Sequence, residues 1–272
     1  MAAELDEDRF VRLVGKHFVV LLFRLIRKDG QHIDDYASCF VIELDRTWFL
    51  MTAGHVIKNI ADSVLGGATL SKLRLVDVFA GKSLPPLPVA FDVSDWVAIE
   101  EDGADFAALP LNPLVRAGLV AAGVVPLAES HVGAASLDAY SQVFLVGAPS
   151  ETFMQAGTDG SVKLMMIPVK AHQPSEDHPQ RGETVLAALP DSSPTSAHRV
   201  GDVQGMSGCP VFGLRQESET TAKYWVIGLQ STWYKGARVV RLCPLGRFID
   251  ALRKGLIAFR QCYEGEPGSA VP

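Results

Sequence analysis

The 272-residue chain is long enough for one large domain or two small ones, with a sizeable buried core. Its hydrophobic content of 48% and charged content of 21% are ordinary for a globular protein and exclude a largely disordered chain. A formal net charge of -6, without a basic stripe, argues against a nucleic-acid-binding protein. The longest apolar segment, residues 18–25, is too short to span a bilayer, so we expect no membrane segment.

The pattern of apolar residues in the first half of the chain predicts one helix followed by short strands. Apolar residues at helical spacing predict an amphipathic helix over residues 4–15. Two β-rich runs, 17–26 and 36–44, flank a polar connection that contains Asp29-Gly30, a hairpin-like signal. A third run leads to His55, beyond which a short helix is expected over 57–63. Further strands are predicted at 72–79, 87–91, 96–99 and 106–109.

The second half shows the same pattern of short strands. Residues 114–133 are rich in Ala, Gly and Val without clear periodicity, which predicts a linker between the halves. The polar stretch 171–181 is expected to be an exposed loop, and 245–257 has the apolar spacing of a C-terminal helix. Strands are predicted at 140–149, 161–169, 184–188, 210–214 and 223–230. Many short strands separated by turns favour barrels over a parallel α/β sheet.

Targeting and metal-binding signals are weak. Residues 1–9 carry acids rather than the basic start and apolar run of a signal peptide, so we expect the chain in the cytoplasm. The cysteines have no Cys-x-x-Cys pairing and are too sparse for a disulfide scaffold, which predicts free thiols. The histidines share no ligand spacing, so neither a metal site nor a cofactor is predicted. The cysteines are Cys39, Cys209, Cys243 and Cys262.

Residues 204–212 place a serine, Ser207, between glycines and ahead of an apolar strand. A serine hydroxyl attacks a carbonyl poorly unless a histidine takes its proton and donors receive the oxyanion that forms. Gly205 and Gly208 permit a tight turn in which the amides of Gly205 and Ser207 point into one pocket. Taken alone, the pattern fits equally well an ordinary Gly-Ser-Gly turn before a strand.

Two upstream stretches favour the catalytic interpretation. An apolar run over 48–51 ends in small residues before His55, and Asp105 opens a second apolar run, so the order is His, Asp, Ser. Three alternatives remain: His55 as a strand-end histidine without a catalytic role, Asp102 as the acid if the strand is shifted, and Cys209 as a thiol nucleophile. Because Cys209 stands two positions after the serine and before a proline, we interpret it as a small buried residue.

These stretches resemble the motifs of trypsin-like (chymotrypsin-fold) serine proteases, nearer to the bacterial HtrA-type branch than to secreted digestive enzymes. Residues 52–55 match Thr-Ala-x-His, 105–109 match Asp-x-Ala-x-Leu, and 205–210 match Gly-x-Ser-Gly-x-Pro. The resemblance implies an all-β fold of two packed six-stranded antiparallel β-barrels, with a short N-terminal helix and a C-terminal helix. It divides the chain into the N-terminal helix at 1–16, a first barrel at 17–125, a second barrel with the C-terminal helix at 126–262, and a disordered tail at 263–272.

The resemblance also implies a function, that of a serine endopeptidase acting on protein or peptide substrates through an acyl-enzyme intermediate. His55 and Asp105 come from the first barrel and Ser207 from the second, so that the active site lies between them. His55 would take the Ser207 proton, ionised Asp105 would orient the imidazole, and the amides of Gly205 and Ser207 would form the oxyanion hole. No cofactor is implied.

The substrate pocket departs from the family pattern. Relatives have a glycine where Trp233 stands, so either the loop is shifted by a residue or the pocket is narrowed and favours small apolar side chains. Asp202 and Arg238 both have the potential to approach the pocket, with opposite consequences for charge preference. The pocket walls are expected at Gly201, Asp202, Ser231, Thr232 and Trp233.

Other departures concern regulation. Digestive relatives pair a new N-terminus with an Asp where Met206 stands, so we expect no activation by N-terminal trimming. Secreted relatives carry a cysteine where Val56 stands, which agrees with a reducing compartment. No PDZ domain is expected after the C-terminal helix. A stand-alone cytoplasmic protease must avoid indiscriminate cleavage, so activity is expected to depend on an activating partner protein, on oligomerisation or on a substrate-ordered loop.

Two other functions stay open. One is a protease-fold binding or regulatory module whose site is latent or inactive. The other is an esterase that uses the same acyl-transfer machinery, although Ser207 lacks the Gly-x-Ser-x-Gly elbow of α/β-hydrolases.

Overall fold

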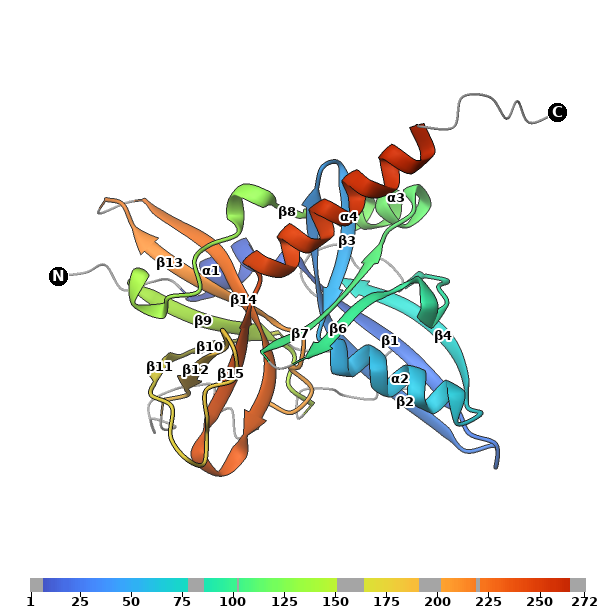
Figure 1. Cartoon of the computed structure of the whole chain (residues 1–272), viewed down its shortest axis with the longest axis horizontal. Helices are drawn as coiled ribbons and strands as arrows, with labels where there is room; N and C mark the ends of the chain where they lie inside the picture. The colour runs from blue at the N-terminus through green and yellow to red at the C-terminus, as the bar shows by residue number, and fades with distance from the viewer. Residues whose placement is uncertain are drawn as a thin grey trace.

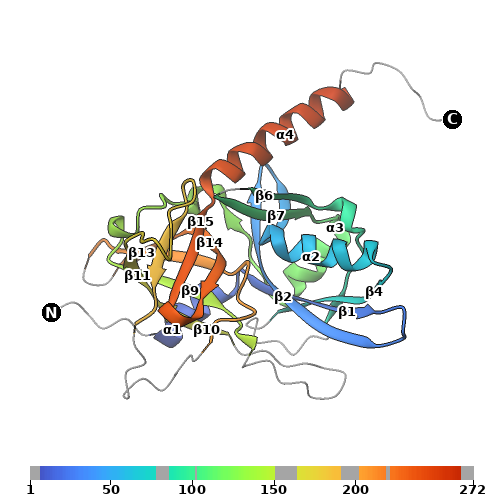
Figure 2. The same ribbon diagram turned by 60° about the horizontal axis from the view of Figure 1, so that its bottom comes forward.

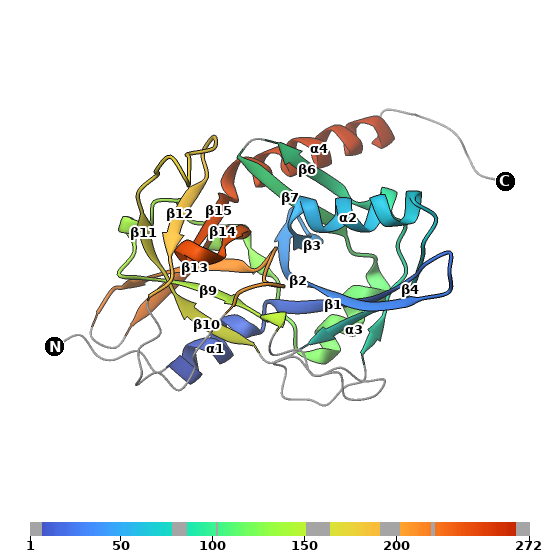
Figure 3. The ribbon, with the colours of Figure 1, turned by 90° about the horizontal axis from the view of Figure 1, so that it is seen from below.

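The computed structural model describes residues 7–77, 86–101, 103–150, 164–190, 202–218 and 221–264. The all-β prediction is confirmed, because two antiparallel sheets, each built from one half of the chain, pack side by side as barrels (Figures 1 and 3). Among the described residues, no helix combines the length and apolar character needed to cross a bilayer. The predicted boundaries 1–16, 17–125, 126–262 and 263–272 remain predictions.

The first sheet has the strand order β5-β4-β1-β2-β3-β7-β6, with β8 pairing in parallel to β2. Eight described strands replace the six expected, because the two-residue strand β5 joins one edge of the sheet and the two-residue strand β8 pairs with the end of β2. The strands are β1 (Phe18–Ile26), β2 (His32–Leu44), β3 (Thr47–Thr52), β4 (Thr69–Asp77), β5 (Leu87–Pro88), β6 (Val97–Glu101), β7 (Ala104–Pro110) and β8 (Leu127–Ala128).

The second sheet has the order β10-β9-β13-β14-β15-β12-β11, seven described strands in place of six. The run 239–244, absent from the predicted strands, forms β15, and the predicted loop at 171–181 begins inside β11. Strand β11 pairs with β12, and β15 pairs with both β14 and β12, so each strand is defined by its partners as well as by its own residues. The strands are β9 (Gln142–Gly147), β10 (Met165–Pro168), β11 (Lys170–His172), β12 (Val185–Ala188), β13 (Pro210–Gln216), β14 (Ala222–Tyr234) and β15 (Val239–Pro244).

The predicted linker at 114–133 is wrong in its first part, which forms helix α3 (Pro113–Ala122). Asn112 caps the helix, since its side chain accepts a hydrogen bond from the Val115 amide at 2.9 Å. Gly123, with φ of 88°, ends it in the left-handed conformation. The start and stop signals were therefore present in the sequence. The other helices are α1 (Glu7–Gly15), α2 (Gly54–Leu65) and α4 (Gly246–Glu264).

One apolar core runs across both sheets. Phe40 and Met51 from the first sheet and Phe144 and Phe212 from the second are buried in the same cluster. Helix α4 leaves β15 and runs past the edge formed by β6 and β7 (Figures 1 and 2). The barrels therefore meet through a continuous apolar contact, and groups at the seam are held in fixed relative positions.

Candidate active site

His55 lies at the start of α2, which begins at Gly54 rather than near residue 57 as predicted. The N-cap residue Ala53 has no side chain that can cap the helix. Instead, Oδ1 of Asp105, on β7, accepts the His55 backbone N–H at 2.8 Å. A carboxylate from a neighbouring strand thus caps α2, where the helix dipole also favours negative charge.

The same carboxylate orients the His55 ring. His55 Nδ1–H donates to Asp105 Oδ2 at 2.6 Å, so Nε2 is left as the proton-accepting nitrogen. A Cβ on Gly54 would collide with the Ile99 carbonyl and would lie 3.1 Å from Asp105 Oδ1. Glycine at this position therefore allows the helix terminus to approach the acid closely enough for both hydrogen bonds.

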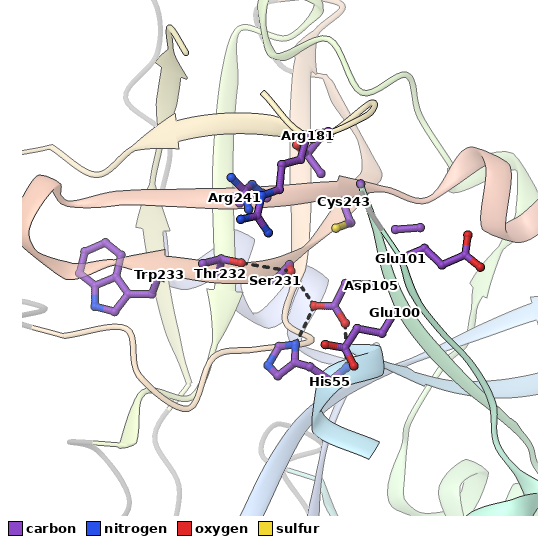
Figure 4. Close-up of a pocket in the computed structure, with 13 residues that line it drawn as sticks. His55, Glu100, Glu101, Asp105, Arg181, Ser231, Thr232, Trp233, Arg241 and Cys243 are labelled. Atoms are coloured by element: carbon purple, nitrogen blue, oxygen red, sulfur yellow. Dashed lines mark hydrogen bonds and ion pairs between the residues drawn. The ribbon is translucent and has the colours of Figure 1, made fainter. Parts of the chain in front are cut away.

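Asp105 has a third partner that the sequence did not indicate. The Ser231 hydroxyl, on β14, donates to Asp105 Oδ2 at 2.5 Å (Figure 4). Burial by itself would raise the Asp105 pKa, but the hydrogen bonds from His55 and Ser231 outweigh it and leave this pKa below its ordinary value. Asp105 is therefore the ionised acid beside His55. The alternative acid, Asp102, lies outside the described residues.

Ser207 lies in a turn between two glycines with positive φ, 84° at Gly205 and 88° at Gly208. A Cβ on Gly208 would collide with Thr52 Oγ1 and would lie 2.8 Å from the Ala53 amide nitrogen. The serine turn therefore packs against the residues that lead into His55. Within the described residues, no hydrogen bond joins Ser207 Oγ to His55 Nε2.

The backbone around Gly205 has a defined orientation. The Ser150 amide donates to the Gln204 carbonyl at 2.7 Å, so the Gly205 N–H of the same planar peptide points the opposite way. The Ser38 hydroxyl donates to the Gly205 carbonyl at 3.0 Å and holds the next peptide. Among the described residues, the amides of Gly205 and Ser207 donate no hydrogen bond, so both are free to receive an anion.

Two side chains of β2 support this turn and were missed in the sequence. The Tyr36 hydroxyl donates to the Ala148 carbonyl at 2.9 Å and would collide with a Cβ on Gly205. Ser38 is fully buried, and its carbonyl accepts a hydrogen bond from the Thr52 hydroxyl at 2.9 Å. Polar residues inside an otherwise apolar strand were the available signal, because buried hydroxyls require partners.

Cys209 is fully buried and packs against Gly147, where a Cβ would collide with its sulfur. Burial raises the pKa of the Cys209 thiol to about 12, which removes the thiolate that a cysteine nucleophile needs. The thiol-nucleophile alternative is therefore disfavoured. Cys39 and Cys243 are also buried free thiols, and the side chain of Cys262 lies outside those described.

The expected pocket walls are partly brought together. Trp233 Nε1–H donates to Asp202 Oδ1 at 2.8 Å, and Lys235 Nζ lies 2.7 Å from Asp202 Oδ2. These bonds lower the Asp202 pKa, chiefly through Lys235, and neutralise much of its charge. Arg238 donates to the Pro190 carbonyl at 3.4 Å. Gly201 lies outside the described residues.

A cavity of about 570 Å³ opens beside His55 and Asp105 (Figure 4). Ser231, Thr232 and Trp233 line it from β14, and Glu100 and Glu101 line it from β6. Both barrels therefore contribute walls. In the part of the chain that the structure describes, no group of three or more His, Cys, Asp or Glu side chains is arranged to hold a metal ion.

No protein-family model matches the chain, and no curated protein matches it. Among solved structures, it is similar to the protease Anisep from Arthrobacter nicotinovorans, at 15% identity over 84% of this chain and 90% of that one, with a TM-score of 0.45. It is also similar to the serine endoprotease from Yersinia pestis, at 11% identity over 93% of this chain and 67% of that one, with a TM-score of 0.47.

Proposed function

We propose that the chain is a serine endopeptidase with Ser207 as nucleophile, His55 as general base and Asp105 as the orienting acid. The observation that carries this proposal is the pair of hydrogen bonds that His55 donates to Asp105, from its backbone N–H and from Nδ1–H, which leaves Nε2 as the acceptor. The packing of Gly208 against Thr52 and Ala53 supports it, because it brings the serine turn to the residues before His55.

In the proposed reaction, Ser207 Oγ attacks the carbonyl carbon of a peptide bond while His55 Nε2 accepts the hydroxyl proton. The carbonyl oxygen becomes an oxyanion, which the Gly205 and Ser207 amides stabilise; losing one such donor typically costs about 3 kcal/mol. Asp105 stabilises the imidazolium. The protonated His55 then gives its proton to the departing amine, and the C–N bond breaks to leave an acyl-serine. Water, deprotonated by His55, hydrolyses this ester and restores the serine.

One observation favours the alternative of a binding or regulatory module with a latent site, namely that no hydrogen bond joins Ser207 to His55 within the described residues. Catalytic hydrogen bonds are often long in ligand-free enzymes and shorten when substrate binds. The peptidase and the binding-module hypotheses therefore differ in whether the Ser207 hydroxyl becomes a reactive nucleophile.

A fluorophosphonate probe tests this difference, since only an activated serine reacts with it quickly. We expect the purified protein to be labelled once, and Ser207→Ala and His55→Ala to lose labelling, while Ser175→Ala, an exposed loop serine, serves as the unaffected control. Labelling that requires added cell extract would indicate an activating partner. No labelling under either condition, or labelling that persists in Ser207→Ala, would refute the peptidase proposal.

A further inference from the structure

The cavity beside His55 contains a buried arginine. Arg241, on β15, is only 4% exposed, and its Nη2 donates to the Pro179 carbonyl at 3.1 Å. Its guanidinium lies over the Tyr234 ring, 5.2 Å from the ring centroid. Its Nε is buried and has no hydrogen-bond partner among the described residues. A buried guanidinium donor is costly unless a ligand or an ordered water supplies the acceptor.

A second arginine lines the same cavity. Arg181 lies in the loop between β11 and β12 and lines the cavity together with Arg241 (Figure 4). In the described part of the chain, neither arginine forms an ion pair with a carboxylate. An anion that enters the cavity would therefore meet two guanidinium groups whose charges no carboxylate of the described residues pairs with.

The loop that carries Arg181 is held in place. The Thr184 hydroxyl, which is buried, donates to the Arg181 carbonyl at 2.7 Å. Gln180 Nε2 donates to the Gly182 carbonyl at 3.1 Å. A Cβ on Gly103 would lie 2.9 Å from both the Arg181 carbonyl oxygen and the Gly182 Cα, so the loop abuts the β6–β7 turn of the other barrel. Arg181 therefore extends from a fixed position on the cavity wall.

The acidic groups at this cavity do not neutralise the arginines. Asp105 is already bonded to His55 and Ser231. Glu100 and Glu101 belong to the opposite wall on β6 and are exposed, so water screens their charges. The basic side of the cavity is thus the wall formed by the second barrel.

The basic wall also adjoins the segment expected to bind substrate. Thr232 pairs with Arg241 across β14 and β15, and the preceding residue, Ser231, bonds to the catalytic acid. A peptide that adds a strand along this segment would direct alternate side chains toward and away from the cavity. One side chain near the scissile bond would therefore reach the arginines.

We infer that the cavity binds the carboxylate of an acidic substrate residue, Asp or Glu, a few positions from the scissile bond, with Arg241 and Arg181 as its anion-binding groups. This inference rests on the proposed peptidase function. It assigns the enzyme a class of substrates, namely polypeptides with an acidic residue near the cleavage point.

Binding to Ser207→Ala tests the subsite without requiring catalysis. The probes are fluorescently labelled octapeptides with an Ala-Ala centre, each carrying Glu at one scanned position and matched to the same peptide with Gln. At one position or more, we expect the Glu peptide to bind at least about tenfold more tightly, the difference of roughly one charge-assisted hydrogen bond. Arg181→Gln and Arg241→Gln in the same background should each remove most of this preference.

The variants are chosen so that misfolding does not obscure the result. Arg181 is exposed, so Arg181→Gln is expected to fold, and Arg241→Lys keeps the buried charge. Arg12→Gln, an exposed arginine on α1, removes one charge elsewhere and should leave the preference unchanged. Equal binding of Glu and Gln peptides at every position, or a preference that survives Arg181→Gln and Arg241→Gln, would overturn the inference.

The unmodified protein separates this inference from the proposed function. Cleavage of the Gln and Glu peptides at equal rates would be consistent with the proposed peptidase function but would contradict the inferred carboxylate-binding subsite. Absence of both cleavage and probe labelling would reject the peptidase, while the binding measurements on Ser207→Ala would still decide whether the arginines recognise a carboxylate.

Discussion

At the scale of single residues, Asp105 organises the site because its two oxygens accept three hydrogen bonds. Oδ1 caps α2 through the His55 amide, and Oδ2 accepts from the His55 ring and from Ser231. The same carboxylate thus places the helix, orients the imidazole and aligns β14. This concentration of contacts explains why an acid that is 7% exposed stays ionised.

Another buried group, His17, couples stability to pH. Its Nδ1–H donates to the Val125 carbonyl at 2.6 Å, and its Nε2 accepts from the Tyr224 hydroxyl at 2.9 Å, so the ring is held neutral. Burial lowers the pKa of His17 from 6.5 to about 4, against the opposing effect of the hydrogen bond to Val125.

His17 should therefore destabilise the fold in acid. Between pH 6.5 and pH 4 the unfolded chain binds a proton that folded His17 does not, so the free energy of unfolding should fall by up to about 3 kcal/mol as the pH decreases. Above pH 6.5 both states are neutral and this contribution is constant. Urea unfolding at pH 7 and pH 4.5 measures the loss, which should be smaller in His17→Gln. Equal losses in the two proteins would contradict the assignment.

At the scale of elements, β14 joins the acid to the substrate pocket. The register between β14 and β15 shifts between Gln230 and Thr232, an irregularity of the kind that redirects side chains. Ser231, at the shift, bonds to Asp105, whereas Trp233, two residues on, bonds to Asp202. One strand thus contacts the proposed acid and links the two segments expected to form the pocket walls.

The indole of Trp233 should restrict the substrate side chain that enters the pocket. We expect Trp233→Ala to raise kcat/KM for peptides with a large apolar residue at the cleavage point, relative to alanine peptides, by about tenfold, the effect of a few methylenes of new apolar contact. Trp225→Ala is the matched control, since Trp225 lies on the same strand and contacts Tyr140 and Arg215 instead. An unchanged ratio in Trp233→Ala would place the indole away from the bound side chain.

At the scale of the whole molecule, one apolar cluster spans both barrels, while a second cluster, drawn from residues 19–124, belongs to the first barrel alone. The rings of Phe106, on β7, and Phe248, on α4, stack at 4.8 Å with an interplanar angle of 10°. Helix α4 follows the last strand of the second barrel, so this contact ties one half of the chain to the other. Since the site lies at the seam, its geometry depends on this packing.

The barrels should consequently unfold together. Scanning calorimetry is expected to show one transition, and Phe248→Ala should lower the free energy of unfolding by about 3 kcal/mol because Phe248 is 3% exposed. The midpoint should fall by roughly 6 to 12 °C without splitting, given the size of the chain. Two separate transitions in the unmodified protein would show that the barrels are independent.

The fold class and the motifs at His55, Asp105 and Ser207 could be predicted from the residues alone. Alternating short apolar runs require a β structure, and the glycines beside Ser207 require a tight turn, since both patterns act through near neighbours along the chain. The capping residues of α3, Asn112 and Gly123, could also be recognised in the sequence, but the Ala-rich run between them has no clear helical periodicity, so the helix was not predicted.

Which distant groups meet depends on the folded arrangement of the strands and could not be predicted from the residues. Ser231, expected in a pocket wall, also bonds to Asp105, and β15, with its buried Arg241, was not predicted. These contacts join residues far apart in the chain, so they depend on strand order and on how the two barrels pack. The burial of a side chain and its hydrogen-bond partners arise from that packing. Local sequence patterns do not encode contacts between distant segments.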